Sequence, residues 1–181
     1  MARILFAEEQ RFTQWWLWAI MLFALLSVLV PFLYGIYSQE VLNKPFGNQP
    51  MSTEGLAVTG TASTLLVLII IVVFNRARLK TKISSDKLAV AFPPFFRKWK
   101  ELVPGEIERY EIRKYNAIRE YGGYGVKRRF KYGQSYTISG NIGLQLYLKN
   151  GKRLLIGTQK RQAIEYAMRK LKMEENSAKN G

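Results

Sequence analysis

The sequence predicts an α+β protein in which a two-helix transmembrane hairpin precedes a basic, strand-rich domain that ends in a helix. An uncharged stretch of 28 residues runs from Phe12 to Gln39, and a second one of 21 residues runs from Gly55 to Asn75. A helix that crosses about 30 Å of hydrocarbon needs roughly 20 apolar residues, so each stretch is long enough. The residues that follow are polar and basic, and their short alternating apolar runs are typical of strands.

The first span is expected at about residues 13–36. Trp15, Trp16 and Trp18 lie at its start, and Tyr34 and Tyr37 lie at its other end. Aromatic side chains favour the two membrane interfaces, which supports a transmembrane helix. The apolar run is longer than that of a cleaved signal peptide, and no small-x-small motif follows it. We therefore interpret it as a signal anchor.

The second span is expected at residues 55–75, after a short turn-rich linker at residues 37–54. It opens with small residues, and the pairs Thr59/Ser63 and Gly60/Thr64 each lie four positions apart on one helix face. Such a face permits close approach of another helix. It can pack against the first span in an antiparallel hairpin, or it can form a homodimer interface. Neither span contains an ionisable residue, which argues against an ion path.

The distribution of charge predicts the orientation. Residues 76–181 carry 25 Lys and Arg against 9 acidic residues, whereas residues 1–75 carry 3 against 4. Short loops rich in Lys and Arg stay in the cytoplasm, and residues 75–82 carry four such residues against one in the linker. We expect a multi-pass protein of the cytoplasmic (inner) membrane with both termini in the cytoplasm. Residues 1–76 form the membrane hairpin, 77–172 the cytoplasmic domain and 173–181 a flexible tail.

The missing residue types exclude several chemistries. The chain has no Cys and no His, and Asp86 is its only aspartate. Disulfides, thiolate metal sites and cysteine nucleophiles are thus excluded, and the commonest general base is absent. No phosphate-binding glycine motif occurs. We expect no enzyme activity, no metal and no cofactor.

The domain after the spans is expected to contain seven strands and one helix. The strands are predicted at residues 79–83, 87–92, 107–115, 124–130, 135–139, 144–149 and 153–156. Asn150-Gly151 predicts a two-residue hairpin turn between the last two. An amphipathic helix follows, because Ile164, Ala167, Met168 and Leu171 share one helix face. Seven strands and a C-terminal helix are the order of a pleckstrin-homology-like β-barrel capped by its last helix.

Three segments carry a family resemblance: 121–125 (YGGYG), 139–146 (SGNIGLQL) and 154–160 (LLIGTQK). From the first span to Leu171, the chain resembles small bacterial membrane proteins that join two transmembrane helices to a bacterial pleckstrin-homology-like domain. The resemblance implies that fold and a membrane location, and it implies no reaction.

Two basic clusters are the candidate binding sites. Residues 127–131 place four cations within five positions, and Arg97, Lys98 and Lys100 follow an aromatic segment. They can face the anionic inner leaflet, where each cation near the surface contributes about 1 kcal/mol. They can also merely solvate a domain that is already tethered. The candidate electrostatic contacts are Arg97, Lys98, Lys100, Lys127, Arg128, Arg129 and Lys131.

The segment Phe92–Phe96 reads Phe-Pro-Pro-Phe-Phe. It can form an interfacial loop or a docking patch, or Phe95, Phe96 and Trp99 can pack under the barrel while the prolines end a strand. The loop 84–86 is short and carries Asp86, which argues against the phosphoinositide site of eukaryotic pleckstrin-homology domains. The membrane tether argues against a nucleic-acid partner.

The sequence therefore favours a membrane-anchored binding or scaffolding module. Its expected partners are membrane lipids, with a protein partner or a homodimer as further possibilities. The alternative is an accessory subunit of a larger membrane complex of the transporter or secretion type. In that case the small-residue face and residues 92–96 make the contacts.

Overall fold

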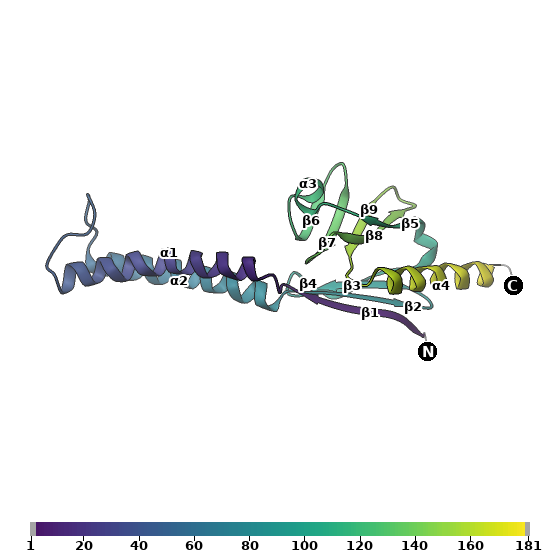
Figure 1. Cartoon of the computed structure of the whole chain (residues 1–181), viewed down its shortest axis with the longest axis horizontal. Coiled ribbons are helices and arrows are strands. Elements are labelled where there is room, and N and C mark those ends of the chain that lie inside the picture. The colour runs from purple at the N-terminus through teal and green to yellow at the C-terminus, as the bar shows by residue number, and fades with distance from the viewer. Residues whose placement is uncertain (1–2, 180–181) are drawn as a thin grey trace. The chain divides into compact units, whose positions relative to one another are not determined.

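The computed structural model describes residues 3–179, which form an α+β protein with nine strands, four α-helices and one short 3₁₀ helix (Figure 1). The chain divides into two compact units. One unit comprises residues 13–75. The other comprises residues 1–12 together with 76–181, so it combines segments from both sides of the helical part.

The first unit is a pair of helices, α1 (Trp15–Glu40) and α2 (Thr53–Arg76), which lie side by side (Figure 1). Both are long and apolar enough to cross a membrane, with mean hydropathies of 2.4 and 2.5. Gly60 of the small-residue face packs against α1, because a Cβ atom added there would lie 2.8 Å from Cγ of Phe32. At the helix ends, the Thr53 hydroxyl donates a hydrogen bond to Oε1 of Gln39 over 3.0 Å. Gly60 thus contributes to packing within the hairpin.

The second unit contains a four-stranded antiparallel sheet in the order β1-β2-β3-β4. Its strands are β1 (Ile4–Arg11), β2 (Arg78–Ser84), β3 (Leu88–Phe92) and β4 (Phe96–Leu102). Strand β1 precedes the helical pair in the sequence and β2 follows it, yet Arg11 lies opposite Arg78 in the register. Residues 4–11, which the sequence pattern grouped with the membrane hairpin, therefore belong to this sheet.

A five-stranded sheet has the order β5-β8-β9-β7-β6. Its strands are β5 (Ile107–Lys114), β6 (Gly125–Arg129), β7 (Gly133–Thr137), β8 (Ile142–Leu148) and β9 (Arg153–Gly157). Strands β7 and β9 pair in parallel, and the other pairs are antiparallel. The 3₁₀ helix at Pro104–Glu106 and the helix α3 (Ala117–Tyr121) are short connections.

Strand β1 is fixed by its inward-facing side chains. Phe6, Glu8 and Gln10 alternate with exposed residues and are all buried. The Glu8 carboxylate accepts hydrogen bonds from the Thr158 hydroxyl at 2.6 Å and from the Gln159 backbone N–H at 2.9 Å. The Gln10 amide donates to the backbone carbonyl of residue 157 over 2.8 Å. These bonds satisfy polar groups that would otherwise be buried without partners.

The C-terminal helix α4 (Arg161–Lys179) contacts β1, β2 and β8, so it touches both sheets. Its four predicted apolar positions are confirmed as core residues with no exposed surface: Ile164, Ala167, Met168 and Leu171. Residues 173–179, expected to be a flexible tail, continue the helix. The Lys172 ammonium pairs with Glu175 one turn further on, over 2.9 Å, which supports that extension. Asn180 and Gly181 lie outside the described residues.

All seven predicted strands occur, and β1 and β4 are additional. The expected seven-strand barrel capped by the last helix is not confirmed, because the strands of the described residues form two separate sheets. Strand β4 lies at the edge of its sheet, and five of its seven residues are exposed. Its sequence therefore lacks the alternation that marks a half-buried strand.

Candidate functional site: a basic cleft between the two sheets

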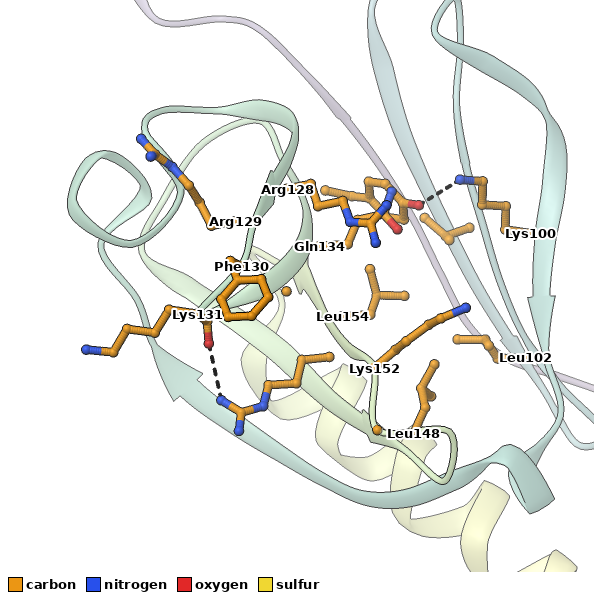
Figure 2. A pocket seen from close by; sticks show the side chains of 15 residues that line it. Lys100, Leu102, Arg128, Arg129, Phe130, Lys131, Gln134, Leu148, Lys152 and Leu154 are labelled. Carbon is orange, nitrogen blue, oxygen red and sulfur yellow. Dashed lines mark hydrogen bonds between the residues drawn. The ribbon is translucent and has the colours of Figure 1, made fainter.

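A cleft of about 920 Å³ opens between the two sheets of the second unit (Figure 2). One wall comes from β3 and β4, and the other comes from the β6–β7 and β8–β9 hairpins. Six cations line it: Lys100, Arg128, Arg129, Lys131, Lys152 and Arg153. All six are exposed, and no acidic residue lines the cleft. Over the described part of the chain, none of the six forms a salt bridge.

The cations differ in where their side chains point. Figure 2 shows Arg128 and Lys152 extending over the cleft from opposite hairpins, whereas Arg129 and Lys131 point away from it. The Lys100 ammonium is held by a 2.9 Å hydrogen bond to the hydroxyl of Tyr136. Lys100, Arg128 and Lys152 are therefore the cations best placed to meet one bound anion.

Lys100 is also held by aromatic rings. Its Nζ atom lies 4.4 Å from the ring centroid of Phe96, and the Phe96 and Tyr136 rings pack with their centroids 5.0 Å apart. A cation over an aromatic ring is attracted by the negative ring face. The Lys100 charge is thus positioned by groups that do not neutralise it.

The turns of the β6–β7 and β8–β9 hairpins carry or adjoin the other cations of the cleft. Gly133 and Gly151 both have positive φ, at 83° and 75°, which glycine adopts without strain. In the β8–β9 turn, the Lys152 backbone N–H donates to Oδ1 of Asn150 over 3.1 Å. The predicted hairpin between these strands occurs and places Lys152 at the rim of the cleft, but its turn is longer than the two residues predicted, because the Leu148 N–H donates to the Lys152 carbonyl across a loop of residues 149–151.

The floor of the cleft is apolar. Leu102, Leu148, Leu154 and Val90 contribute to it from four different strands. Phe130 lies at the turn between β6 and β7, lines the same cleft and is fully exposed. The cleft therefore combines an apolar floor with a positively charged rim. Ligand pockets commonly have this composition, in which a few polar groups orient a mostly apolar ligand.

The structure brings four of the seven sequence-predicted contact residues to this cleft: Lys100, Arg128, Arg129 and Lys131. Arg97, Lys98 and Lys127 do not line it. The sequence reasoning did not identify Lys152 and Arg153. The sequence signal that could have identified them is the Asn150-Gly151 turn, because residues directly after a hairpin turn lie at the exposed end of the hairpin.

The loop at residues 84–86 is occupied by another part of the chain. Ser85 accepts a hydrogen bond from the Arg3 backbone N–H over 3.2 Å and donates its own backbone N–H to the Arg3 carbonyl over 3.0 Å. The adjacent Lys87 ammonium pairs with Glu101 over 2.9 Å. These contacts occupy polar groups of the loop and the Lys87 charge, which argues against an anion site there.

The aromatic segment at residues 92–96 divides between core and surface. Phe92 is fully buried and packs edge-on against Phe95 and Phe96, with centroid distances of 5.4 and 6.4 Å. Phe95 and the nearby Trp99 are exposed. The interpretation that Phe95, Phe96 and Trp99 pack in the interior is thus correct for the half-buried Phe96 and wrong for Phe95 and Trp99, which lie on the surface.

A second polar cluster lies on the five-stranded sheet. The Arg113 guanidinium donates to the Glu120 carboxylate over 2.7 Å and to Oε1 of Gln145 over 3.1 Å. Burial acts to raise the pKa of Glu120, but the hydrogen bonds from Arg113 and from the Asn116 backbone lower the pKa below its ordinary value. This network joins α3 to β5 and β8, and we assign it a structural role.

The composition of the cleft defines what it can do chemically. Its lining contains cations, amide and hydroxyl groups and apolar side chains, with no carboxylate to act as a base. Among the described residues, no group of three or more acidic side chains could hold a metal ion. The cleft is suited to binding an anion.

No protein-family model matches the chain, and no curated protein matches it.

Proposed function

We propose that this chain is a membrane-anchored binding module whose basic cleft binds anionic lipid headgroups. The carrying observation is the cleft itself, with six exposed cations, no acid in the lining and no salt bridge to a described residue. Unpaired cations on concave apolar walls attract anions strongly, because the low-dielectric walls concentrate the field. The lipid headgroup is favoured as ligand because the same chain carries two helices suited to a membrane.

Membrane insertion of α1 and α2 is supported by their dimensions and surfaces. Helices of 26 and 24 residues extend about 39 and 36 Å at 1.5 Å per residue, which exceeds about 30 Å of hydrocarbon. Most of their large apolar side chains are exposed, among them Ile20, Phe23 and Ile69. Hydrocarbon is the environment in which such surfaces are stable.

The pairing of β1 with β2 supports the placement of both flanks of the hairpin on one side of the membrane. The two strands form one antiparallel ladder from Ile4 to Arg11, so they occupy the same compartment whenever the domain is folded. The positive charge of the second half then favours the cytoplasmic side of an inner membrane.

The topology can be tested with single cysteines, since the chain has none of its own. Cysteines replace Ile4, Asn48 and Met173 one at a time, all at exposed positions. A membrane-impermeant maleimide added to intact cells should label only the Asn48→Cys variant. Labelling of the Met173→Cys variant from outside would contradict the orientation.

A pleckstrin-homology-like relationship is part of the proposal. It is supported by the order of strands in two sheets followed by one helix that contacts both. The departures are the strand β1 supplied from before the spans and the parallel pair β7–β9. The proposed relationship would be refuted by an experimental structure of the domain in which α4 does not pack against two sheets.

The lipid-binding proposal is tested on the full chain purified in a non-ionic detergent. Short-chain phosphatidylglycerol and phosphatidylcholine are titrated by native mass spectrometry at low salt. The test variant combines Lys100→Gln, Arg128→Gln and Lys152→Gln. The matched control combines Lys114→Gln, Arg119→Gln and Arg161→Gln, which removes the same charge from exposed positions outside the cleft.

Three cations at about 1 kcal/mol each correspond to about 100-fold in affinity. We therefore expect the cleft variant to lose at least about tenfold in phosphatidylglycerol affinity, and the control variant to lose about threefold or less. Equal losses in both variants would show that only net charge matters. Equal wild-type affinity for the two lipids would remove the headgroup proposal and leave an acidic protein partner as the alternative.

A further inference from the structure

We propose that the cleft accommodates an acyl chain as well as the head of a phospholipid with net negative charge. The chain lies on the leucine floor, the phosphate meets Lys100, Arg128 and Lys152, and Phe130 covers the chain. This inference rests on the proposed function, because it assigns a ligand class to the same cleft.

The apolar floor is the first reason. Leu102, Leu148 and Leu154 come together from β4, β8 and β9 beneath the charged rim. Leu148 and Leu154 are already largely buried, so a small soluble anion that bound only the rim would leave mainly the half-buried Leu102 and the exposed Phe130 facing water. An acyl chain removes itself and this remaining apolar surface from water, and the gain is proportional to the apolar area covered. The volume of about 920 Å³ is at the upper end of the range for small-molecule sites, about 300–1,000 Å³.

The position of Phe130 is the second reason. Its side chain is fully exposed although it lines the cleft, and within the described residues it makes no aromatic or cation–π contact. Figure 2 shows its ring at the β6–β7 hairpin, beside Lys131 and on the same side of the view as Arg129. A large apolar side chain held in water at a hairpin turn is suited to cover an apolar ligand.

The charge of the rim is the third reason and sets the specificity. Lys152 extends across the leucine floor towards Leu102, so its ammonium lies where the apolar surface ends (Figure 2). The rim offers no acid to a positively charged head. A phosphate that carries net negative charge is attracted, whereas a choline group brings its own cation to a basic site and is disfavoured.

The test is photocrosslinking in a bilayer with the full chain. The protein is reconstituted in neutral phosphatidylcholine that contains a trace of phosphatidic acid with a diazirine on its acyl chain. A parallel sample contains phosphatidylcholine with the same diazirine chain. After illumination and digestion, mass spectrometry locates the crosslinks. Labelling of residues 13–75 serves as the internal standard in each sample.

We expect the phosphatidic acid probe to label peptides containing Leu102, Phe130 or residues 148–154, and the phosphatidylcholine probe to label them at least fivefold less. Phe130→Ser should reduce cleft labelling at least threefold, whereas Ile118→Ser, at an apolar residue 73% exposed on α3, should leave it unchanged. Both positions are on the surface, so neither variant disturbs the core.

Three outcomes would overturn the inference: no labelling of the cleft peptides, equal labelling by the two probes, or labelling that Phe130→Ser does not change. In each case the detergent titration still decides the proposed function. A preference for phosphatidylglycerol lost in the cleft variant, without cleft crosslinks, would mean that the cleft binds the headgroup alone.

Discussion

Because β1 pairs with β2, the domain can be separated from the helices by joining these two strands directly. Since Arg11 lies opposite Arg78 in an antiparallel ladder, Phe12 and Ala77 are the next pair towards the helical segment. Replacing residues 13–76 by Asn-Gly closes a two-residue hairpin of the type that joins antiparallel strands. We predict that this fused domain is a soluble monomer without detergent, whereas a chain that starts at Ala77 and lacks β1 is not stably folded.

The magnitude follows from the contacts of β1. Burying a Phe side chain such as Phe6 contributes about 1.5–3 kcal/mol. Each hydrogen bond to the buried Glu8 carboxylate contributes about 1.5–3 kcal/mol because one partner is charged, and there are two. Losing β1 therefore removes about 5 kcal/mol or more. This equals the whole stability of a marginal domain, about 5–15 kcal/mol.

The assay is urea denaturation followed by circular dichroism, after gel filtration without detergent. The fused domain should unfold cooperatively, and the chain from Ala77 should be aggregated or unfold at a much lower urea concentration. Glu8→Gln in the fused domain should cost about 1–3 kcal/mol, since it keeps the strand and removes the charge. The reasoning would be refuted if the chain from Ala77 unfolded with a free energy within about 1 kcal/mol of the fused domain.

Two further predictions concern the second unit. The pKa of Glu120 is lowered from 4.5 in the folded state, so its ionised carboxylate stabilises the protein above about pH 4.5. This stabilisation is lost as the pH falls through the folded-state pKa. Glu120→Gln should cost about 1–3 kcal/mol at pH 7 and make the urea midpoint less sensitive to pH as the solution is acidified below about pH 4.5. An unchanged pH profile would contradict the role of the Arg113 pair. Gly133→Ala should destabilise more than Gly151→Ala in urea, because both have positive φ but only a Cβ at Gly133 would overlap the Arg153 carbonyl. Equal costs would show that the close approach of β7 and β9 is relaxed elsewhere.

The elements found from the sequence are those with local signals. The amphipathic face of α4 was visible because Ile164 and Leu171 and the residues between them bury one continuous stripe. The β8–β9 hairpin could be predicted because Asn150 and Gly151 are turn-forming residues next to each other, although the loop is longer than the two residues predicted. The two long apolar helices were visible from composition alone. Each of these signals lies within a single segment of chain.

Strand β1 and the cleft depend on contacts between distant segments. Glu8 and Gln10 are polar residues that face inward, and the partner of Glu8 is Thr158, 150 positions away. A pattern read from residues 4–11 alone therefore could not show that these residues form a strand of the domain, and the sequence pattern grouped them with the membrane hairpin. The cleft likewise joins Lys100 and Lys152 from different sheets, and the local run at 127–131 could not show which of its side chains point outward.

The position of β1 also constrains how the protein reaches its topology under the proposed membrane insertion. Residues 4–11 are synthesised before α1, but their partners at 78–84 and the bonding groups of Thr158 and Gln159 come later. The sheet can therefore close only after both helices have been made. If only one helix crossed the membrane, β1 and β2 would lie on opposite sides, and the polar bonds of Glu8 and Gln10 could not form. Strand pairing thus stabilises the two-crossing topology over the one-crossing alternative, in addition to the effect of the cationic residues after α2.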